Sequence, residues 1–162
     1  MVTSEQQLPK GAIFIDSENQ PDLNLAELLE RLPCEIIIKY AYADWRNRRL
    51  NRLAGDLETQ GFKMYHFSSG SFLGSEKDKA DHYMAEGIEQ ALQEQSDIVM
   101  FIIVSGDRYF AEVVKMLKSQ CKRVIVAANH SRTSKQLQKS ANVYYPLGGV
   151  TQKDSTQSFQ AA

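Results

Sequence analysis

Short apolar runs recur along the chain, and each is separated from the next by a stretch with the spacing of an amphipathic helix. The five runs that have the length of a β-strand lie at residues 12–15, 35–43, 61–67, 97–104 and 123–128. Strands that alternate with helices in this way are typical of βαβ units, in which successive strands lie parallel in one sheet. The pattern therefore predicts an α/β protein.

The segments between the runs place apolar residues at i, i+3, i+4 and i+7, the positions that share one face of a helix. Helices are expected at 25–32, 50–57 and 110–117, around Met84, Ile88 and Leu92, and, more weakly, at 132–140 before a short strand at 143–145. The longest loop signal, rich in serine and glycine, covers residues 67–78.

The first, fourth and fifth strand runs are continuously apolar instead of alternating, as expected for strands that helices cover on both faces. We therefore predict a Rossmann-like three-layer fold with a mainly parallel sheet of five or six strands in an order near 3-2-1-4-5. A chain of 162 residues that is 43% hydrophobic fits one domain with a sizeable core. We assign this domain to residues 11–147, between a polar lead (1–10) and a flexible polar tail (148–162).

The charge of the chain is nearly balanced, with 19 basic against 20 acidic residues. A net charge of −1 creates no overall field for an acidic partner, so contact with nucleic acid requires a local patch. The amino terminus lacks an apolar signal core, and no apolar run has the length of a membrane span, so we expect a cytoplasmic protein without a membrane partner. The sequence leaves open whether the chain forms a homodimer.

Several common α/β sites lack their motifs. The first strand run is not followed by GxGxxG, and neither GxxxxGK[ST] nor GxSxG occurs, which argues against dinucleotide, P-loop and serine hydrolase sites. Cys34 and Cys121 stand far apart, and the three histidines are scattered, so we expect reduced thiols and no zinc site. An aspartyl phosphatase is also disfavoured, because its DxD pair reads DSE at residues 16–18.

Carboxylates follow two strands that the predicted order makes neighbours. Asp16 ends the first strand and Asp107 follows the fourth, and parallel strands present their carboxyl ends at one edge, where ligands bind at the switch point. Asp81 lies in KDKADHYM, which we expect to be the first turn of the third helix. Three carboxylates that converge suit Mg²⁺ or Mn²⁺, and a divalent ion would relieve their repulsion. The alternative for Asp107 is a helix cap before RYFAEVV.

Three segments resemble one protein family. FIDSENQ (14–20), KDKADHYM (77–84) and IIVSGDRYF (102–110) resemble the motifs of NYN domains, the LabA-like branch of the PIN-like nucleases, and the resemblance runs from about residue 11 to 147. It implies a metal-dependent ribonuclease or a relative of one, built on a Rossmann-like parallel sheet. By position, Asp16, Asp81 and Asp107 match the metal ligands of the family, and Asn19 matches the asparagine that helps to order the site.

The sequence departs from the family pattern at three positions. Tyr109 replaces the second aspartate of SGDxDF, and Asn142 stands where many members have an aspartate before the last strand. For the second acid that many members carry in the third helix, Glu86 is the nearest candidate, in an imperfect register. These departures make a second metal and full nuclease activity open questions.

Contacts to a substrate are expected from two groups of residues. Ser17, Ser105, Lys77 and Lys79 lie near the predicted site and could touch metal waters or phosphates, although the lysines are equally consistent with a solvated helix start. The only dense basic cluster comprises Trp45, Arg46, Arg48, Arg49 and Arg52, which suits phosphate contacts and base stacking on a single strand. The alternative is an ordinary helix surface in which Arg52 pairs with Asp56.

Taken together, these features predict a nuclease that uses Mg²⁺ or Mn²⁺ to hydrolyse phosphodiester bonds, most simply an endoribonuclease acting on single-stranded RNA. In such a reaction the ion lowers the pKa of a bound water that attacks in line. The alternative is a catalytically weakened NYN-like module that binds RNA or protein as a regulator, with Tyr109 as its mark.

Overall fold

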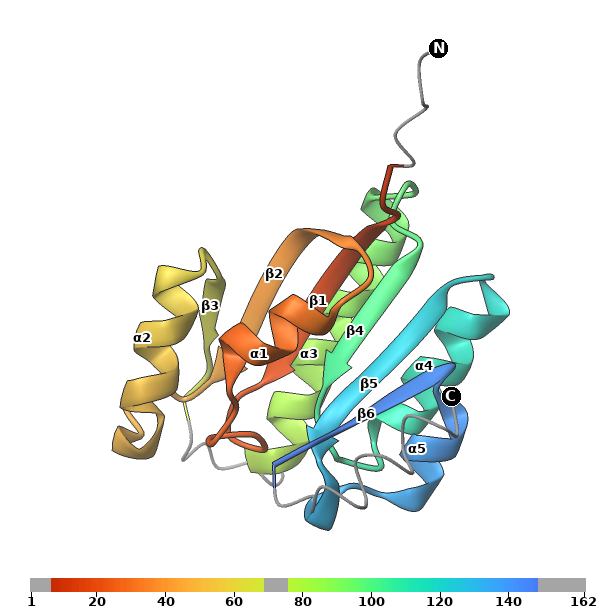
Figure 1. Cartoon of the computed structure of the whole chain (residues 1–162). Helices are drawn as coiled ribbons and strands as arrows, with labels where there is room; N and C mark the ends of the chain where they lie inside the picture. The colour runs from red at the N-terminus through yellow and green to blue at the C-terminus, as the bar shows by residue number, and fades with distance from the viewer. Residues whose placement is uncertain (1–6, 69–75, 149–162) are drawn as a thin grey trace.

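The computed structural model describes residues 7–68 and 76–148, without the side chains of residues 76–79. In this part of the chain six parallel strands form one sheet in the order β3-β2-β1-β4-β5-β6 (Figure 1). The strands are β1 (Lys10–Asp16), β2 (Glu35–Ala43), β3 (Lys63–His66), β4 (Met100–Val104), β5 (Arg123–Asn129) and β6 (Val143–Leu147). The α/β class and the strand order expected from the sequence are therefore confirmed.

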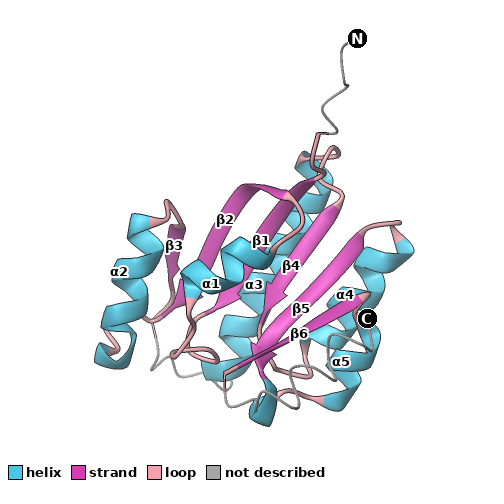
Figure 2. Ribbon diagram, viewed as in Figure 1, coloured by secondary structure: helices cyan, strands magenta, loops and turns pink. Residues whose placement is uncertain are grey.

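Helices cover both faces of the sheet (Figure 2). They are α1 (Leu25–Arg31), α2 (Asn51–Thr59), α3 (Glu76–Glu94), α4 (Phe110–Ser119) and α5 (Lys135–Ser140), with short 3₁₀ turns at η1 (Arg48–Leu50) and η2 (His130–Arg132). The leucines of α1 and α2 pack in one apolar cluster with one face of the sheet. The apolar residues of α3, α4 and α5 pack in a second cluster with the other face. The result is the three-layer arrangement predicted from the strand pattern.

The sheet explains why the central strands read as uninterrupted apolar runs. All five residues of β4 are buried, and β5 is buried from Val124 to Ala128. Side chains alternate between the two faces of a strand, so a strand with a helix layer on each side buries both sets. Pairing of Ile15 with Val104 brings the carboxyl ends of β1 and β4 together, and Asp16 pairs with Tyr42 of β2. After β1 the chain connects to β2 on one side of the sheet, and after β4 it connects to β5 on the other side. The adjacent ends of β1 and β4 therefore form the switch point of the sheet.

Two elements differ from expectation in their limits. The strand expected at 143–145 extends to Leu147 and pairs with β5 along its whole length. Helix α3 begins at Glu76, inside the stretch 67–78 that was expected to be a loop. Residues 69–75 of that stretch, the polar lead up to residue 6 and the tail from residue 149 lie outside the described residues.

The two cysteines are free, with Cys34 buried beneath the sheet and Cys121 exposed, as expected for reduced thiols. Over the described residues, we find no helix whose length and hydropathy would allow it to cross a lipid bilayer.

Candidate functional site

Asp16 and Asp107 are linked by a single serine at the carboxyl edge of the sheet. The Ser105 hydroxyl, which follows β4, donates a hydrogen bond of 2.9 Å to Oδ2 of Asp16, the last residue of β1. The same oxygen, Oγ of Ser105, accepts the backbone N–H of Asp107 at 3.2 Å. Because β1 and β4 are adjacent and parallel, two acids 91 positions apart in the sequence share one corner of the sheet.

Burial and charge both act on the Asp16 carboxyl. Burial, which is the largest influence, and the negative charges of Asp107 and Glu18 together raise the pKa of this carboxyl to about 6. Hydrogen bonds from Ser105 and the backbone of Asn19 act in the opposite direction. The ionised form of a carboxyl that is partly desolvated and close to another acid is stabilised by a positive charge beside it.

Amide side chains lock the loop after β1 against β4 and β5. Oδ1 of Asn19 accepts the backbone N–H of Gly106 at 2.8 Å and Nε2 of Gln20 at 2.7 Å. Oε1 of Gln20 in turn accepts the backbone N–H of Asn129 at 2.8 Å. Gln20 is only 3% exposed, so this bridge is buried. Asn19 therefore holds the loop after β1 against the loop that carries Asp107, and Gln20 extends that network to β5, a contact that sequence reasoning missed.

Gly106 is required by close packing. A Cβ placed on Gly106 would come within 2.8 Å of the backbone oxygen of Arg132 and 3.0 Å of Cα of Thr133. The oxygen of Gly106 also accepts the backbone N–H of Ser134 at 3.0 Å. The loop after β5 is thus pressed directly against the loop that carries Asp107, and a side chain at residue 106 would separate the two loops.

Asp107 also takes part in a local turn. Its Oδ1 accepts the backbone N–H of Tyr109 at 3.0 Å, and its backbone oxygen accepts the N–H of Phe110, where α4 begins. The carboxylate therefore stabilises the approach to α4, as the capping alternative proposed, although the N-cap residue itself is Tyr109. One carboxyl oxygen is used in this turn, so the two roles considered for Asp107 are compatible.

Asp81 does not complete a three-carboxylate cluster in the described part of the chain. Among residues 7–68 and 76–148, no group of three or more histidine, cysteine, aspartate or glutamate side chains lies close enough to hold one ion. Because α3 starts at Glu76, Asp81 is the sixth residue of the helix. A turn contains about 3.6 residues, so Asp81 lies beyond the first turn, where it was expected. Its side chain is buried, with 4% of its surface exposed.

The remaining donors fit a divalent ion in part. Mg²⁺ is usually held by one or two carboxylates together with waters and phosphate oxygens, and Asp16 and Asp107 supply such a pair. The raised pKa of Asp16, caused by burial and by the charge of Asp107, fits a site whose carboxylates are completed by a cation. Three protein ligands around one ion are not supported by the described residues.

The serines predicted to touch a substrate are both fully buried. Ser105 uses its hydroxyl to orient Asp16, and Ser17 is 0% exposed, with a hydroxyl that has no hydrogen-bond partner among the described residues. In this structure neither hydroxyl faces solvent, so their contribution is to the interior of the site. The side chains of Lys77 and Lys79, the other predicted contacts, lie outside the described residues.

The basic cluster divides into bound and exposed side chains. Arg52 pairs with Asp56 at 2.9 Å and also donates to the backbone oxygens of Pro21 and Leu23, as expected for a helix surface. The indole N–H of Trp45 donates to the backbone oxygen of Tyr65 at 2.9 Å, and its ring packs against the core. A base could therefore stack only on the part of this ring that remains exposed.

Arg46, Arg48 and Arg49 are exposed beyond the end of β2. Nε and Nη2 of Arg46 donate to the two oxygens of Asp44 at 2.9 and 2.7 Å. The Arg46 side chain is 64% exposed and that of Asp44 only 6%. A buried acid thus holds the arginine beside a hollow of about 480 Å³ that Glu18, Asp44, Arg46 and Asn47 line. Sequence reasoning missed Asp44. Its position directly after β2 was the available signal, since Asp107 was found by its position shortly after β4.

The departures from the family pattern fall at different places. Oδ1 of Asn142 accepts the backbone N–H of Val124 at 2.8 Å at the start of β5, so Asn142 lies at the opposite edge of the sheet from Asp16. Tyr109 is 39% exposed at the start of α4, two residues from Asp107. Glu86 is exposed and pairs with His82 at 3.1 Å, whereas Asp81 is buried. Of the three, Tyr109 lies nearest to the acidic pair.

The fold and this edge define a class: a doubly wound α/β protein whose acidic site lies at the switch point between β1 and β4. The sequence matches the NYN domain over residues 10–148, most of the chain. The chain belongs to the NYN domain family and thereby to the PIN-like nuclease superfamily, whose members typically use divalent metals.

Comparison of structures agrees on the fold. The chain is similar to a crystal structure of a protein of unknown function from Vibrio parahaemolyticus, with a TM-score of 0.73 and 20% sequence identity. The match covers 91% of this chain and 98% of the other. At this identity the likeness concerns the fold alone. No curated protein matches the chain.

Proposed function

We propose that this protein is a metal-dependent nuclease that hydrolyses phosphodiester bonds, with single-stranded RNA as its substrate. The observation that carries the proposal is the Asp16–Ser105–Asp107 arrangement at the switch point of an NYN domain. Two partly buried acids held close together beside a strand end cost stability, and such costs are found where chemistry requires them.

Asp16 and Asp107 are the residues that would hold Mg²⁺ or Mn²⁺. When bound, such an ion supplies a low-pKa water and offsets negative charge on phosphoryl oxygens. Asp81 of α3 is retained as a contributor to metal binding, although the described residues form no group of three such side chains that could hold one ion.

The other residues of the site orient these carboxylates. The Ser105 hydroxyl fixes one oxygen of Asp16 and so directs the second oxygen of that carboxylate. Asn19 holds the Gly106 backbone, and the Gly106 peptide positions Asp107 relative to β1. A rigid frame of this kind favours hydrolysis, because reacting groups need to be held within a fraction of an ångström.

The exposed arginines after β2 provide the surface for a nucleic-acid backbone. Arg46, held by Asp44, and its neighbours Arg48 and Arg49 lie at the same edge of the sheet as Asp16. Guanidinium groups bind phosphates through paired N–H donors. A local patch is needed for this purpose because the chain as a whole carries a charge of only −1.

The test is cleavage of labelled single-stranded RNA by the purified chain in Mn²⁺. Asp16→Asn removes the charge with little change of shape and should abolish cleavage. Asp97→Asn is the matched control, because Asp97 pairs with Lys10 at the amino edge of the sheet, and it should cleave like the parent chain. Equal cleavage by the parent and Asp16→Asn would refute the proposal.

A second function has a specific observation in its favour. The described residues form no three-member metal group, and Tyr109 replaces an acid of the family pattern. These features support an NYN module that binds RNA or a protein as a regulator and cleaves weakly. Calorimetric titration with Mn²⁺ separates the two functions, because a nuclease binds the ion through Asp16 and Asp107. No heat at millimolar Mn²⁺, together with retained RNA binding, would favour the binding module.

A further inference from the structure

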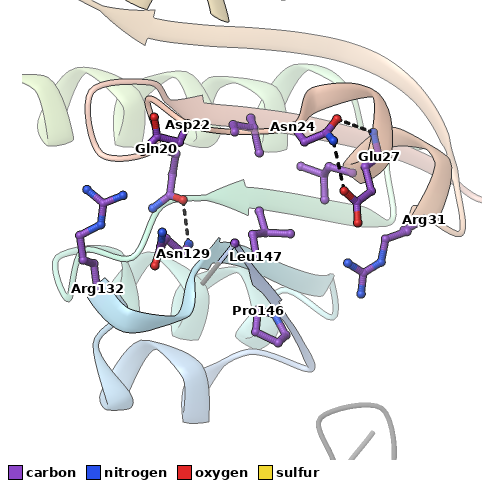
Figure 3. Close-up of a pocket in the computed structure, with 12 residues that line it drawn as sticks. Gln20, Asp22, Asn24, Glu27, Arg31, Asn129, Arg132, Pro146 and Leu147 are labelled. Carbon is purple, nitrogen blue, oxygen red and sulfur yellow. Dashed lines mark hydrogen bonds between the residues drawn. The ribbon is translucent and has the colours of Figure 1, made fainter. Parts of the chain in front are cut away.

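A cleft of about 300 Å³ opens beside the acidic site, between the loop after β1 and the ends of β5 and β6. Figure 3 shows Arg132 at one end of this cleft and Arg31 at the other, with Pro146 and Leu147 of β6 along one side. Ligand pockets for small organic groups begin at about this volume.

Two structural links place the cleft next to the acidic site. Gln20 lines the cleft and donates to Asn19, the residue that binds the Gly106 N–H. Arg132 also lines the cleft, and its backbone oxygen lies so close to Gly106 that a Cβ there would be 2.8 Å away. A strand of nucleic acid whose phosphate reached Asp16 and Asp107 would therefore carry a neighbouring nucleotide past the mouth of the cleft.

The charges of the cleft favour a neutral group. Its charged lining residues are two acids, Asp22 and Glu27, and two arginines, Arg31 and Arg132, which balance. Glu27 is engaged with Asn24, and the Arg31 guanidinium lies 5.0 Å from the centre of the Tyr145 ring. Among the described residues, the side chains of Asp22 and Arg132 make no hydrogen bond and no ion pair.

The lining of the cleft offers the apolar and polar contacts that a nucleobase needs. Leu147 and Pro146 are partly buried and offer an apolar wall, while Asp22 accepts and Arg132 donates hydrogen bonds. The edges of nucleobases carry both donors and acceptors, which arginine and carboxylate side chains read. The two carboxylates and the two arginines of the cleft balance, so the lining offers a phosphate no net attraction.

We propose that this cleft is a nucleobase subsite, which binds the base of a nucleotide next to the scissile phosphate and gives the enzyme its preference for sequence. This inference rests on the proposed nuclease function. Arg132 and Asp22 are its specificity-determining residues, and Gln20 connects the occupied cleft to the loop that carries Asp107.

Binding is tested on the whole chain without metal, by following ¹⁵N resonances during titration with each of the four nucleosides, which carry no phosphate. We expect saturable shifts at Gln20, Asn129 and Leu147, and a separate titration with ribose 5-phosphate should leave them unchanged. Arg132→Ala should weaken nucleoside binding about fivefold or more. Arg123→Ala, an exposed arginine at the amino edge of β5, should leave it unchanged. Absence of shifts up to about 10 mM of every nucleoside, or equal shifts with ribose 5-phosphate, would overturn the subsite.

Cleavage patterns separate this inference from the nuclease proposal. If the parent chain cleaves RNA with a base preference, Arg132→Ala and Asp22→Asn should reduce that preference while cleavage continues. Cleavage with an unchanged pattern in both variants, together with no nucleoside binding, would overturn the subsite and leave the nuclease standing. Nucleoside binding by a chain that cleaves no RNA would retain the cleft as a nucleobase-binding site and reject the nuclease.

Discussion

The Ser105 hydroxyl donates its hydrogen bond to Asp16 across the junction of β4 and β1, at 2.9 Å. This contact joins two segments that are far apart in the sequence. It lies at the switch point, where successive strands are added on opposite sides of the sheet. It only partly offsets the burial and the negative neighbours that raise the pKa of Asp16 to about 6. The site therefore contains a carboxyl whose ionisation opposes folding.

The first prediction concerns stability and pH in metal-free buffer with EDTA. An unfolded aspartate titrates near 3.8 and folded Asp16 near 6, so the folded chain binds more protons between these values. Stability contributed by Asp16 is therefore present below pH 4 and is lost as the pH rises through 6. Asp16→Asn should raise the free energy of unfolding at pH 8 by up to about 3 kcal/mol and change it little at pH 4.

Urea unfolding of parent and variant at the two pH values measures this difference. Asp97→Asn serves as a control of opposite sign, because Lys10 lowers the pKa of Asp97 and the charged form is the stabilising one. A less stable Asp16→Asn at pH 8 would contradict a raised pKa for this carboxyl.

The second prediction separates two glycines. Gly106→Ala places a Cβ 2.8 Å from the Arg132 backbone oxygen, and because a backbone cannot yield as a side chain does, we expect a loss of about 1–3 kcal/mol. Gly55 lies in α2 with nothing within 4 Å of its added Cβ. Gly55→Ala should therefore stabilise the protein by about 1 kcal/mol through helix propensity. Thermal and urea unfolding of both variants test the pair, and equal effects would contradict the packing argument.

Much of the fold follows from local patterns, because continuous apolar runs and helical spacing identify the layers without any tertiary contact. The position of Asp81 did not follow. Glutamate, lysine, aspartate and alanine at 76–80 are compatible with helix and extend α3 upstream of the expected start, which moves Asp81 beyond the first turn. The sequence placed Asp16 and Ser105 at the correct edge of the sheet. It did not predict the hydrogen bond between them, because side-chain orientation depends on packing between distant segments.

Contacts made by turns and by packing were also beyond sequence reasoning. The pairing of buried Asp44 with exposed Arg46 spans two residues but depends on the burial of Asp44 at the end of β2. The Gln20–Asn129 bridge joins residues 109 positions apart. Asn142 could be recognised as a departure from the family pattern, yet only the sheet places it at the edge away from Asp16.

The third prediction concerns the exposed arginines. Replacing Arg46, Arg48 and Arg49 together by alanine should weaken binding of single-stranded RNA and reduce the slope of log affinity against log salt by up to about 2, since each phosphate contact contributes about 0.7. A matched triple alanine variant of Lys115, Lys118 and Lys139, which lie on α4 and α5, should keep the parent slope. Fluorescence anisotropy at several salt concentrations gives both slopes. An unchanged slope in the arginine variant would mean that these three arginines do not contact RNA.

The last prediction restores acids of the family pattern at two places. Tyr109 is exposed and two residues from Asp107, so Tyr109→Asp adds a carboxylate near the acidic pair and should tighten Mn²⁺ binding about tenfold, in line with one further charged ligand. Asn142→Asp adds a carboxylate at the opposite edge, where residue 142 binds the Val124 N–H, and should leave Mn²⁺ affinity unchanged. Calorimetry on both variants compares them with the parent chain. Equal affinities in all three chains would show that residue 109 does not face the ion, and a gain in Asn142→Asp alone would place the metal away from Asp16.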